Sequence, residues 1–178
     1  MLEPLSIEEM DVTPIDPTAV YLYNESNNEA PTYATTYSSG MDLPAWIPGV
    51  KEKFLFNAEL KDDTVIIHPG GRALIPSGMH FGIPQGLEFQ VRSRSGLALK
   101  KGIHVLNGIG TIDADYTGDV GAILHNAGTE DFVIHNGDRI AQLVLMPVLK
   151  VIKFAKADRL EDLPKTNRGQ GGYGHTGI

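Results

Sequence analysis

The sequence contains no cysteine, no basic N-terminal region and no long apolar run. Without cysteine, the chain can form neither a disulfide framework nor a thiolate metal site, which fits a reducing compartment. The first residues do not resemble a signal peptide, and no segment is long and apolar enough to span a membrane. We therefore expect a cytoplasmic protein, or one in the host-cell cytoplasm if the source is a virus.

Positive charge is also scarce, because the net charge of the 178 residues is −7. This balance disfavours non-specific binding to nucleic acid. A polyanionic ligand would need local arginines and a divalent cation to overcome the field. The length is most simply that of one domain with a sizeable core.

Short strand-like stretches dominate the middle of the chain. Residues 64–67, 73–75 and 79–81 are mainly apolar and are separated by turns rich in Gly and Pro, and residues 87–92 alternate strictly between apolar and polar. Residues 139–146 are nearly all apolar, which is typical of a strand buried on both faces or covered by a neighbouring subunit. A helical period is almost absent, so the pattern favours a sandwich, jelly roll or barrel.

One short helix is expected at 95–101, with Ser95 as its cap and Gly102 as its stop. Capping alone does not explain why Arg92 and Arg94 stand directly before it. Backbone amides, a hydroxyl and adjacent guanidinium groups together form an anion site.

Glycines bracket a cluster of acids at 107–119, a pattern typical of two strand ends joined by a tight turn. Carboxylates held on such a turn can hold a metal or activate a water. A solvated acidic hairpin is the alternative.

Two further stretches carry polar groups in unusual settings. Gln142 lies inside an apolar run and needs a hydrogen-bonding partner, for which a core glutamine bonded to backbone is the simpler interpretation. The last residues, 168–178, combine Arg168, Tyr173 and Thr176 with many glycines. They have the parts to wrap a nucleotide, although a tail without regular structure is the alternative.

In chain order, several stretches resemble the motifs of the trimeric dUTP diphosphatases (dUTPases). They are residues 39–43, 92–102, 107–118, 137–142 and 168–177. Met41, Ser93 and Tyr173 depart from the residues usual in that family. Residues 1–30 and 46–62 lie outside the resemblance, as an N-terminal extension with one strand near 20–23 and a surface insertion.

The resemblance implies an all-β, jelly-roll-like distorted barrel or sandwich with one short helix after the Arg-Ser-Gly motif. It also implies hydrolysis of dUTP to dUMP and pyrophosphate with Mg²⁺, in a homotrimer whose active sites are shared between subunits. The β domain would span 31–156. Residues 157–178 would be a linker and a C-terminal arm that becomes ordered over bound nucleotide and closes the site of neighbouring subunits.

The resemblance also implies roles for single residues. Asp113 would be the general base, and Asp42 would support the phosphate and metal region. Mg²⁺ would be held mainly by substrate phosphates and waters, without a certain direct protein ligand. The phosphates would be bound by Arg94, Ser95, Gly96, Gln142, Arg168 and Thr176. The uracil and deoxyribose would be bound by Asn107, Gly110, Ile112, Tyr116 and Tyr173.

Two alternatives remain. A dCTP deaminase of the same fold would have a catalytic glutamate where this chain has Ile123 and an arginine where it has Leu99, and both absences disfavour deamination. A nucleotide-switched role in binding a partner protein is the other, with 1–30 and 46–62 as the candidate surfaces. Co-purification of a protein that stays bound in the presence of a dUTP analogue would favour that role.

Overall fold

The computed structural model describes residues 16, 18–150 and 154–171. They form two compact units, one ending at Val148 and one beginning at Leu149. In the first unit the strands are β1 (Tyr21–Asn24), β2 (Met41–Pro44), β3 (Leu55–Lys61), β4 (Thr64–Pro76), β5 (Met79–Gly82), β6 (Leu87–Arg92), β7 (Ile103–Val105), β8 (Ile109–Ile112), β9 (Gly121–Asn126), β10 (Phe132–Ile134) and β11 (Arg139–Pro147). One α-helix, α1 (Ser95–Lys101), and the short 3-10 turns η2 (Ile47–Gly49) and η3 (Glu52–Phe54) complete it.

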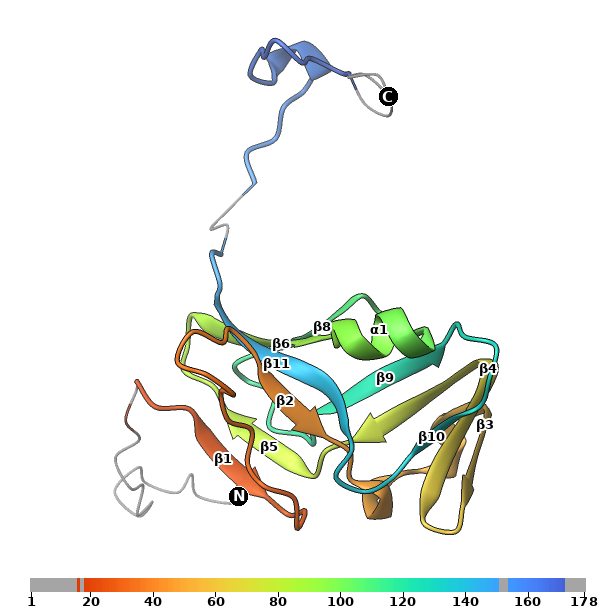
Figure 1. The fold of residues 1–178 in the computed structure, drawn as a ribbon. Helices are drawn as coiled ribbons and strands as arrows, with labels where there is room; N and C mark the ends of the chain where they lie inside the picture. The colour runs from red at the N-terminus through yellow and green to blue at the C-terminus, as the bar shows by residue number, and fades with distance from the viewer. Residues whose placement is uncertain (1–15, 17, 151–153, 172–178) are drawn as a thin grey trace, which may run out of the picture. The chain divides into compact units, whose positions relative to one another are not determined.

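The strands make three antiparallel sheets (Figure 1). The order is β2-β11-β6-β8 in one and β10-β4-β9-β7 in a second, where β3 also pairs with β4, while β1 and β5 form a two-stranded sheet. The expected all-β class with one short helix after the Arg-Ser-Gly motif is thus confirmed. Among the described residues the sheets do not close into a barrel.

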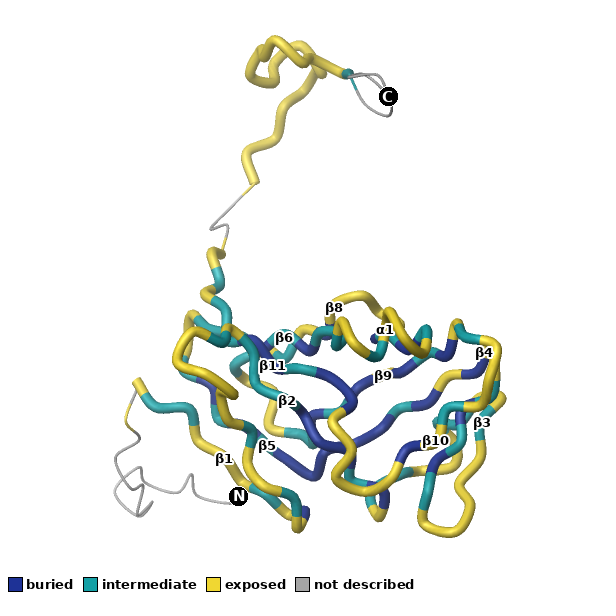
Figure 2. Tube along the Cα trace, viewed as in Figure 1, coloured by how far each residue is buried: buried dark blue, intermediate teal, exposed yellow. Residues whose placement is uncertain are grey.

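The core lies between the sheets and is made of alternating strand residues (Figure 2). Phe89 and Val91 of β6 are almost fully buried, as their alternation with polar residues predicts. On β11, Ile140, Ala141, Leu143 and Val144 are all buried, so the strand is covered on both faces between Ile140 and Val144. Gln142 is only partly buried within it.

Helix α1 covers the predicted residues 95–101, but Ser95 is its first helical residue; the N-cap is Arg94, and no side chain caps the helix. Gly102 ends it with φ of 69°, in the left-handed region. A Cβ there would lie 2.7 Å from the Gly128 amide nitrogen, so both the backbone angle and the close approach require glycine. The helix leaves Arg94 at its start, beyond the end of β6.

Both segments outside the motif resemblance join sheets. The strand expected near 20–23 is β1, which pairs antiparallel with β5. In the 46–62 segment, Ile47 is buried, and β3 pairs with β4 while most of its residues face solvent. The segment predicted as a surface insertion is therefore mostly exposed, but it also contributes a strand to a sheet.

The second unit contains the 3-10 turn η4 (Leu160–Asp162), and its residues 154–170 are all exposed. None of the helices in the described part of the chain has the length and apolar character needed to cross a membrane.

Candidate active site

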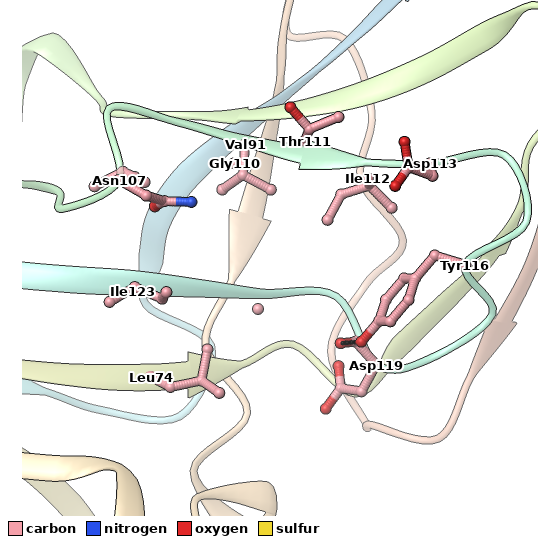
Figure 3. A pocket seen from close by; sticks show the side chains of 12 residues that line it. Leu74, Val91, Asn107, Gly110, Thr111, Ile112, Asp113, Tyr116, Asp119 and Ile123 are labelled. Carbon is pink, nitrogen blue, oxygen red and sulfur yellow. Dashed lines mark hydrogen bonds between the residues drawn. The ribbon is translucent and has the colours of Figure 1, made fainter.

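A cavity of about 260 Å³ lies between β8, at the end of its sheet, and β4 and β9 of the next sheet (Figure 3). Its lining is Leu74, Val91, Val105, Asn107, Gly110, Thr111, Ile112, Asp113, Tyr116, Asp119, Gly121 and Ile123. The acidic stretch singled out in the sequence therefore forms one wall of a cavity. This position favours a functional site over a solvated hairpin.

Asp113 follows β8 at one end of the cavity and is exposed. The turn after it is closed by the Tyr116 amide, which donates to the Asp113 carbonyl at 3.1 Å. The Tyr116 hydroxyl donates to the Asp119 carbonyl at 3.1 Å, so the ring folds back across the turn. A Cβ on Gly118 would collide with that ring, which explains the glycine.

Asp119 also lines the cavity, although the resemblance assigned it no role. Its Oδ1 accepts hydrogen bonds from the amides of Gly78, at 2.9 Å, and Ser77, at 3.3 Å. Burial raises the pKa of this carboxyl above its ordinary value, and the amide bonds only partly oppose the shift. The signal in the sequence was its place as the third acid of the cluster.

Asn107 lies at the other end of the same cavity, where a turn leads into β8 (Figure 3). Gly108 has φ of 75°, and its amide donates to the Val105 carbonyl at 3.0 Å. At Gly110 a Cβ would lie 3.2 Å from the Val91 Cβ, so glycine keeps the cavity open beside β6. As the last strand of its sheet, β8 presents backbone donors and acceptors on its outer edge.

A second cluster of predicted residues surrounds Asp42 on β2. Arg94 Nε lies 2.8 Å from Asp42 Oδ1, and Arg139 Nη1 lies 3.2 Å from Oδ2. Arg94 Nη1 also donates to the Arg139 carbonyl at 2.7 Å. Arg139 was not predicted, and its signal was its place directly after Asp138 in the 137–142 motif. Asp42 therefore orients two guanidinium groups at one place.

Gln142 stands opposite Asp42 in the β2–β11 pairing, so it belongs to the same cluster. Its Nε2 donates to the Ser93 carbonyl at 2.9 Å, which is the backbone bond that the sequence-based alternative expected. This bond fixes the side chain beside the arginines. Ser95 and Gly96 follow Arg94 and are exposed at the start of α1.

The two clusters do not meet within one chain. In the β6–β8 pairing, Arg92 is opposite Ile109 and Phe89 is opposite Ile112. Arg94 therefore lies beyond one end of β8 and Asp113 beyond the other, about 10 Å apart or more at 3.3 Å per strand residue. Neither Arg94 nor Gln142 lines the cavity.

Of the predicted tail residues, only Arg168 is described. It is exposed, and its Nε donates to the Gly171 carbonyl at 2.7 Å. Tyr173 and Thr176 lie outside the described residues. Across the described part of the chain, no group of three or more His, Asp or Glu side chains is arranged to hold a metal ion.

Residues 56–177 match the family model for dUTPase. A deoxyuridine 5'-triphosphate nucleotidohydrolase of Syntrophotalea carbinolica is 44% identical over 148 residues, which cover 83% of this chain and 88% of that protein. The corresponding protein of Chlamydia caviae is 48% identical over 153 residues, covering 86% of this chain and 94% of its own. The chain belongs to the dUTPase family.

Solved structures agree with this dUTPase assignment at the level of the fold. The dUTPase of Staphylococcus bacteriophage 80alpha with dUpNHpp superposes with a TM-score of 0.72 and 21% identity, covering 90% of this chain and 99% of that one. The dUTPase of phage phi11 of S. aureus, whose structure describes coordination of a structural Mg(II) ion, gives 0.64 and 20% identity, over 80% and 99% of the two chains.

Proposed function

We propose that this chain hydrolyses dUTP to dUMP and pyrophosphate in the β8 cavity. The observation that supports this most is the position of Asp113. The cavity that Asp113 lines brings together this exposed carboxylate, the edge of a terminal strand and the exposed Tyr116 ring in a chain of the dUTPase family.

The uracil would bind along β8, where the bare backbone edge and the Asn107 amide offer both donors and acceptors. Uracil presents alternating carbonyl and N–H groups, so such an edge can pair with it. Gly110 and Ile112 would face the nucleoside, because both line the cavity on the same side of the strand. Tyr116 would lie under the deoxyribose, and Tyr173 would cover the base.

Asp113 would orient a water and accept its proton, so that the water attacks the α-phosphorus in line with the leaving pyrophosphate. The proton moves to the carboxylate as the new P–O bond forms, and the α–β bridging oxygen leaves with the electron pair of the broken bond. Arg94, Ser95, Gly96, Gln142, Arg168 and Thr176 would hold the phosphates and stabilise the developing charge.

Mg²⁺ would be held mainly by phosphate oxygens and waters, as this cation prefers when it accompanies triphosphates. The residues fit that arrangement. The exposed Asp113 carboxylate lines the cavity, and the arginines around Asp42 can neutralise part of the phosphate charge, so the cation needs few direct protein ligands. When bound, the ion would neutralise phosphate charge.

The active site would be shared within a homotrimer. In one chain, Asp113 and the Arg94–Asp42–Arg139 cluster flank opposite ends of β8, so a single triphosphate bound in the cavity cannot use both from the same chain unless it spans that strand. A second copy can bring its arginine cluster to the Asp113 end. A tail from a further copy would then close the site.

Pyrophosphate release should be measured with dUTP, UTP, dTTP and dCTP in parallel. We expect dUTP to be preferred by at least about 10²-fold, because the pocket must reject both a 2′-hydroxyl and a 5-methyl group and must read the uracil edge. Equal turnover of two or more of the four nucleotides would contradict the proposed specificity. Ammonia release from dCTP would instead support deamination.

Replacing Tyr116 tests how the sugar is selected. Tyr116→Ala should raise the UTP/dUTP ratio of kcat/KM by about tenfold, because the ring's bulk is what would exclude the 2′-hydroxyl. Tyr116→Phe is the matched control, since it keeps the ring and removes only the hydroxyl that donates to the Asp119 carbonyl. An unchanged ratio in Tyr116→Ala would move sugar discrimination to another residue.

A partner-binding role remains a prediction. The 46–62 segment offers a surface for it, because Phe56 and Leu60 of β3 are 46% and 39% exposed. The co-purification experiment with a dUTP analogue tests it, and recovery of no bound protein would count against it.

A further inference from the structure

His80 of β5 connects the N-terminal strand to the turn that carries Tyr116. Its Nε2 lies 2.8 Å from the Glu25 carboxylate, in the segment directly after β1. Its Nδ1 lies 2.8 Å from the carbonyl oxygen of Thr117. One imidazole therefore contacts two segments that are far apart in the sequence.

Both of these partners are hydrogen-bond acceptors. A neutral imidazole has only one N–H, so it can donate to Glu25 or to Thr117 but not to both. The imidazolium has two N–H groups and satisfies both partners at once. Both acceptors therefore receive a hydrogen bond from His80 only when its ring is protonated.

The charged groups around the ring favour that proton. Glu25 approaches from the end of β1 and Asp119 from the cavity turn, while Tyr23 stands opposite His80 in the β1–β5 pairing, with the two ring centroids 5.5 Å apart. The Glu25 hydrogen bond, followed by the Thr117 carbonyl, raises the pKa of His80 above its ordinary value of 6.5. The imidazolium contacts are therefore fully present below that value and are lost as the pH rises through the higher pKa of the folded protein.

The same strand end holds the rest of the turn. The Gly78 amide donates to Asp119 Oδ1 at 2.9 Å, and the Val120 amide donates to the Met79 carbonyl at 2.9 Å. These bonds fix the turn after Thr117, whereas His80 fixes Thr117 itself, the residue next to Tyr116. The position of the Tyr116 ring therefore depends both on the bonds that hold Asp119 and Val120 and on the bond between His80 and Thr117.

We propose that protonated His80 is a positioning residue for nucleotide binding, tying Glu25 to the Thr117 carbonyl and thereby holding Tyr116 in the cavity wall. The proposal rests on the proposed role of that cavity. It gives the N-terminal segment a function, because Glu25 sets the pH range over which the turn is held. Loss of the proton releases one of the two contacts and weakens nucleotide binding.

The test is binding of α,β-imido-dUTP, a non-hydrolysable analogue, measured from pH 5.5 to 8.5 with Mg²⁺ present. Wild type should bind about three- to tenfold more weakly once His80 loses its proton, which is part of the effect of one charge-assisted hydrogen bond. Glu25→Gln should move that transition to lower pH, because the amide no longer stabilises the imidazolium. His80→Gln should abolish the pH-dependent change in analogue binding that shifts in Glu25→Gln. Titration of the ligand's own phosphate is common to all variants and cancels in the comparison.

Glu59→Gln is the matched control, since it removes the same charge from an exposed position on β3. It should leave the transition where it is in wild type. Direct NMR titration of the His80 ring should show its pKa falling in Glu25→Gln and unchanged in Glu59→Gln. In steady-state kinetics, the pH-dependent change should appear in KM more than in kcat, because His80 does not line the cavity and would act only through the turn that carries Tyr116.

A binding transition that stays at the same pH in Glu25→Gln, while the NMR titration shows a lowered His80 pKa, would overturn the proposal. The cavity assignment is tested separately, because Tyr116→Ala should weaken analogue binding at every pH. If Tyr116→Ala binds as wild type does, the proposed nucleoside site is wrong. If it binds weakly but the Glu25 variant behaves as Glu59→Gln does, only the role of His80 is wrong.

Discussion

Asp113→Asn should lower dUTP turnover by at least about 10²–10⁴-fold, the contribution expected of a general base. The amide has the same shape as the carboxylate but cannot accept a proton from the attacking water. Because Asp113 is exposed at the end of β8, its replacement removes no buried contact, and the fold should be unchanged. Binding of α,β-imido-dUTP should remain close to wild type. The loss should therefore appear in kcat, with little change in Kd.

Single-turnover kinetics on purified protein separate these quantities. Asp115→Asn is the matched control, because it makes the same change on the same turn at an exposed carboxylate that does not line the cavity. We expect it to keep turnover within about threefold of wild type. Turnover of Asp113→Asn within about tenfold of wild type would show that another group accepts the proton.

The motifs predicted the local structures well because each depends on neighbouring residues. Gly102 ends the helix through its left-handed backbone angle, a signal that lies at the helix end itself, whereas the cap expected at Ser95 was wrong because Arg94 is the N-cap. The alternation at Phe89 and Val91 predicts which face of β6 is buried. The acidic turn was recognisable for the same reason, since its glycines and carboxylates are contiguous.

Contacts between distant segments were not predictable in this way. Arg139 meets Asp42 across a strand pairing, and His80 meets both Glu25 and Thr117 across a sheet and a turn. No spacing in the sequence encodes such distances. Asp119 was visible only as one more acid, because its hydrogen bonds come from the Ser77–Gly78 turn. The proposed sharing of active sites could not be derived from spacing for the same reason, since it would depend on surfaces from more than one chain.

Removing residues 166–178 should abolish most turnover while leaving the fold intact. Residues 154–170 are all exposed, so the described part of the removed segment adds little to a buried core. Melting temperature and oligomer mass should therefore change very little. Turnover should fall by at least about 10²-fold, because the segment carries Arg168, Tyr173 and Thr176 and would complete the phosphate contacts and exclude water. A truncated chain with near wild-type turnover would show that the tail has no part in the reaction.

Mixing this truncated chain with full-length Asp113→Asn tests whether sites are shared. Neither parent should be active, because one would lack the tail and the other the general base. If a site takes Asp113 from one subunit and the tail from another, equal mixing with free exchange makes about a quarter of the sites complete, since each of the two parts is intact in half of the chains. Activity should then return to about a quarter of the wild-type value. Mixing the truncated chain with truncated Asp113→Asn is the control, and it should stay inactive because no chain has a tail. If mass spectrometry shows mixed oligomers and activity does not return, Asp113 and the tail of a site must come from the same chain, and the proposed sharing of these two parts is wrong.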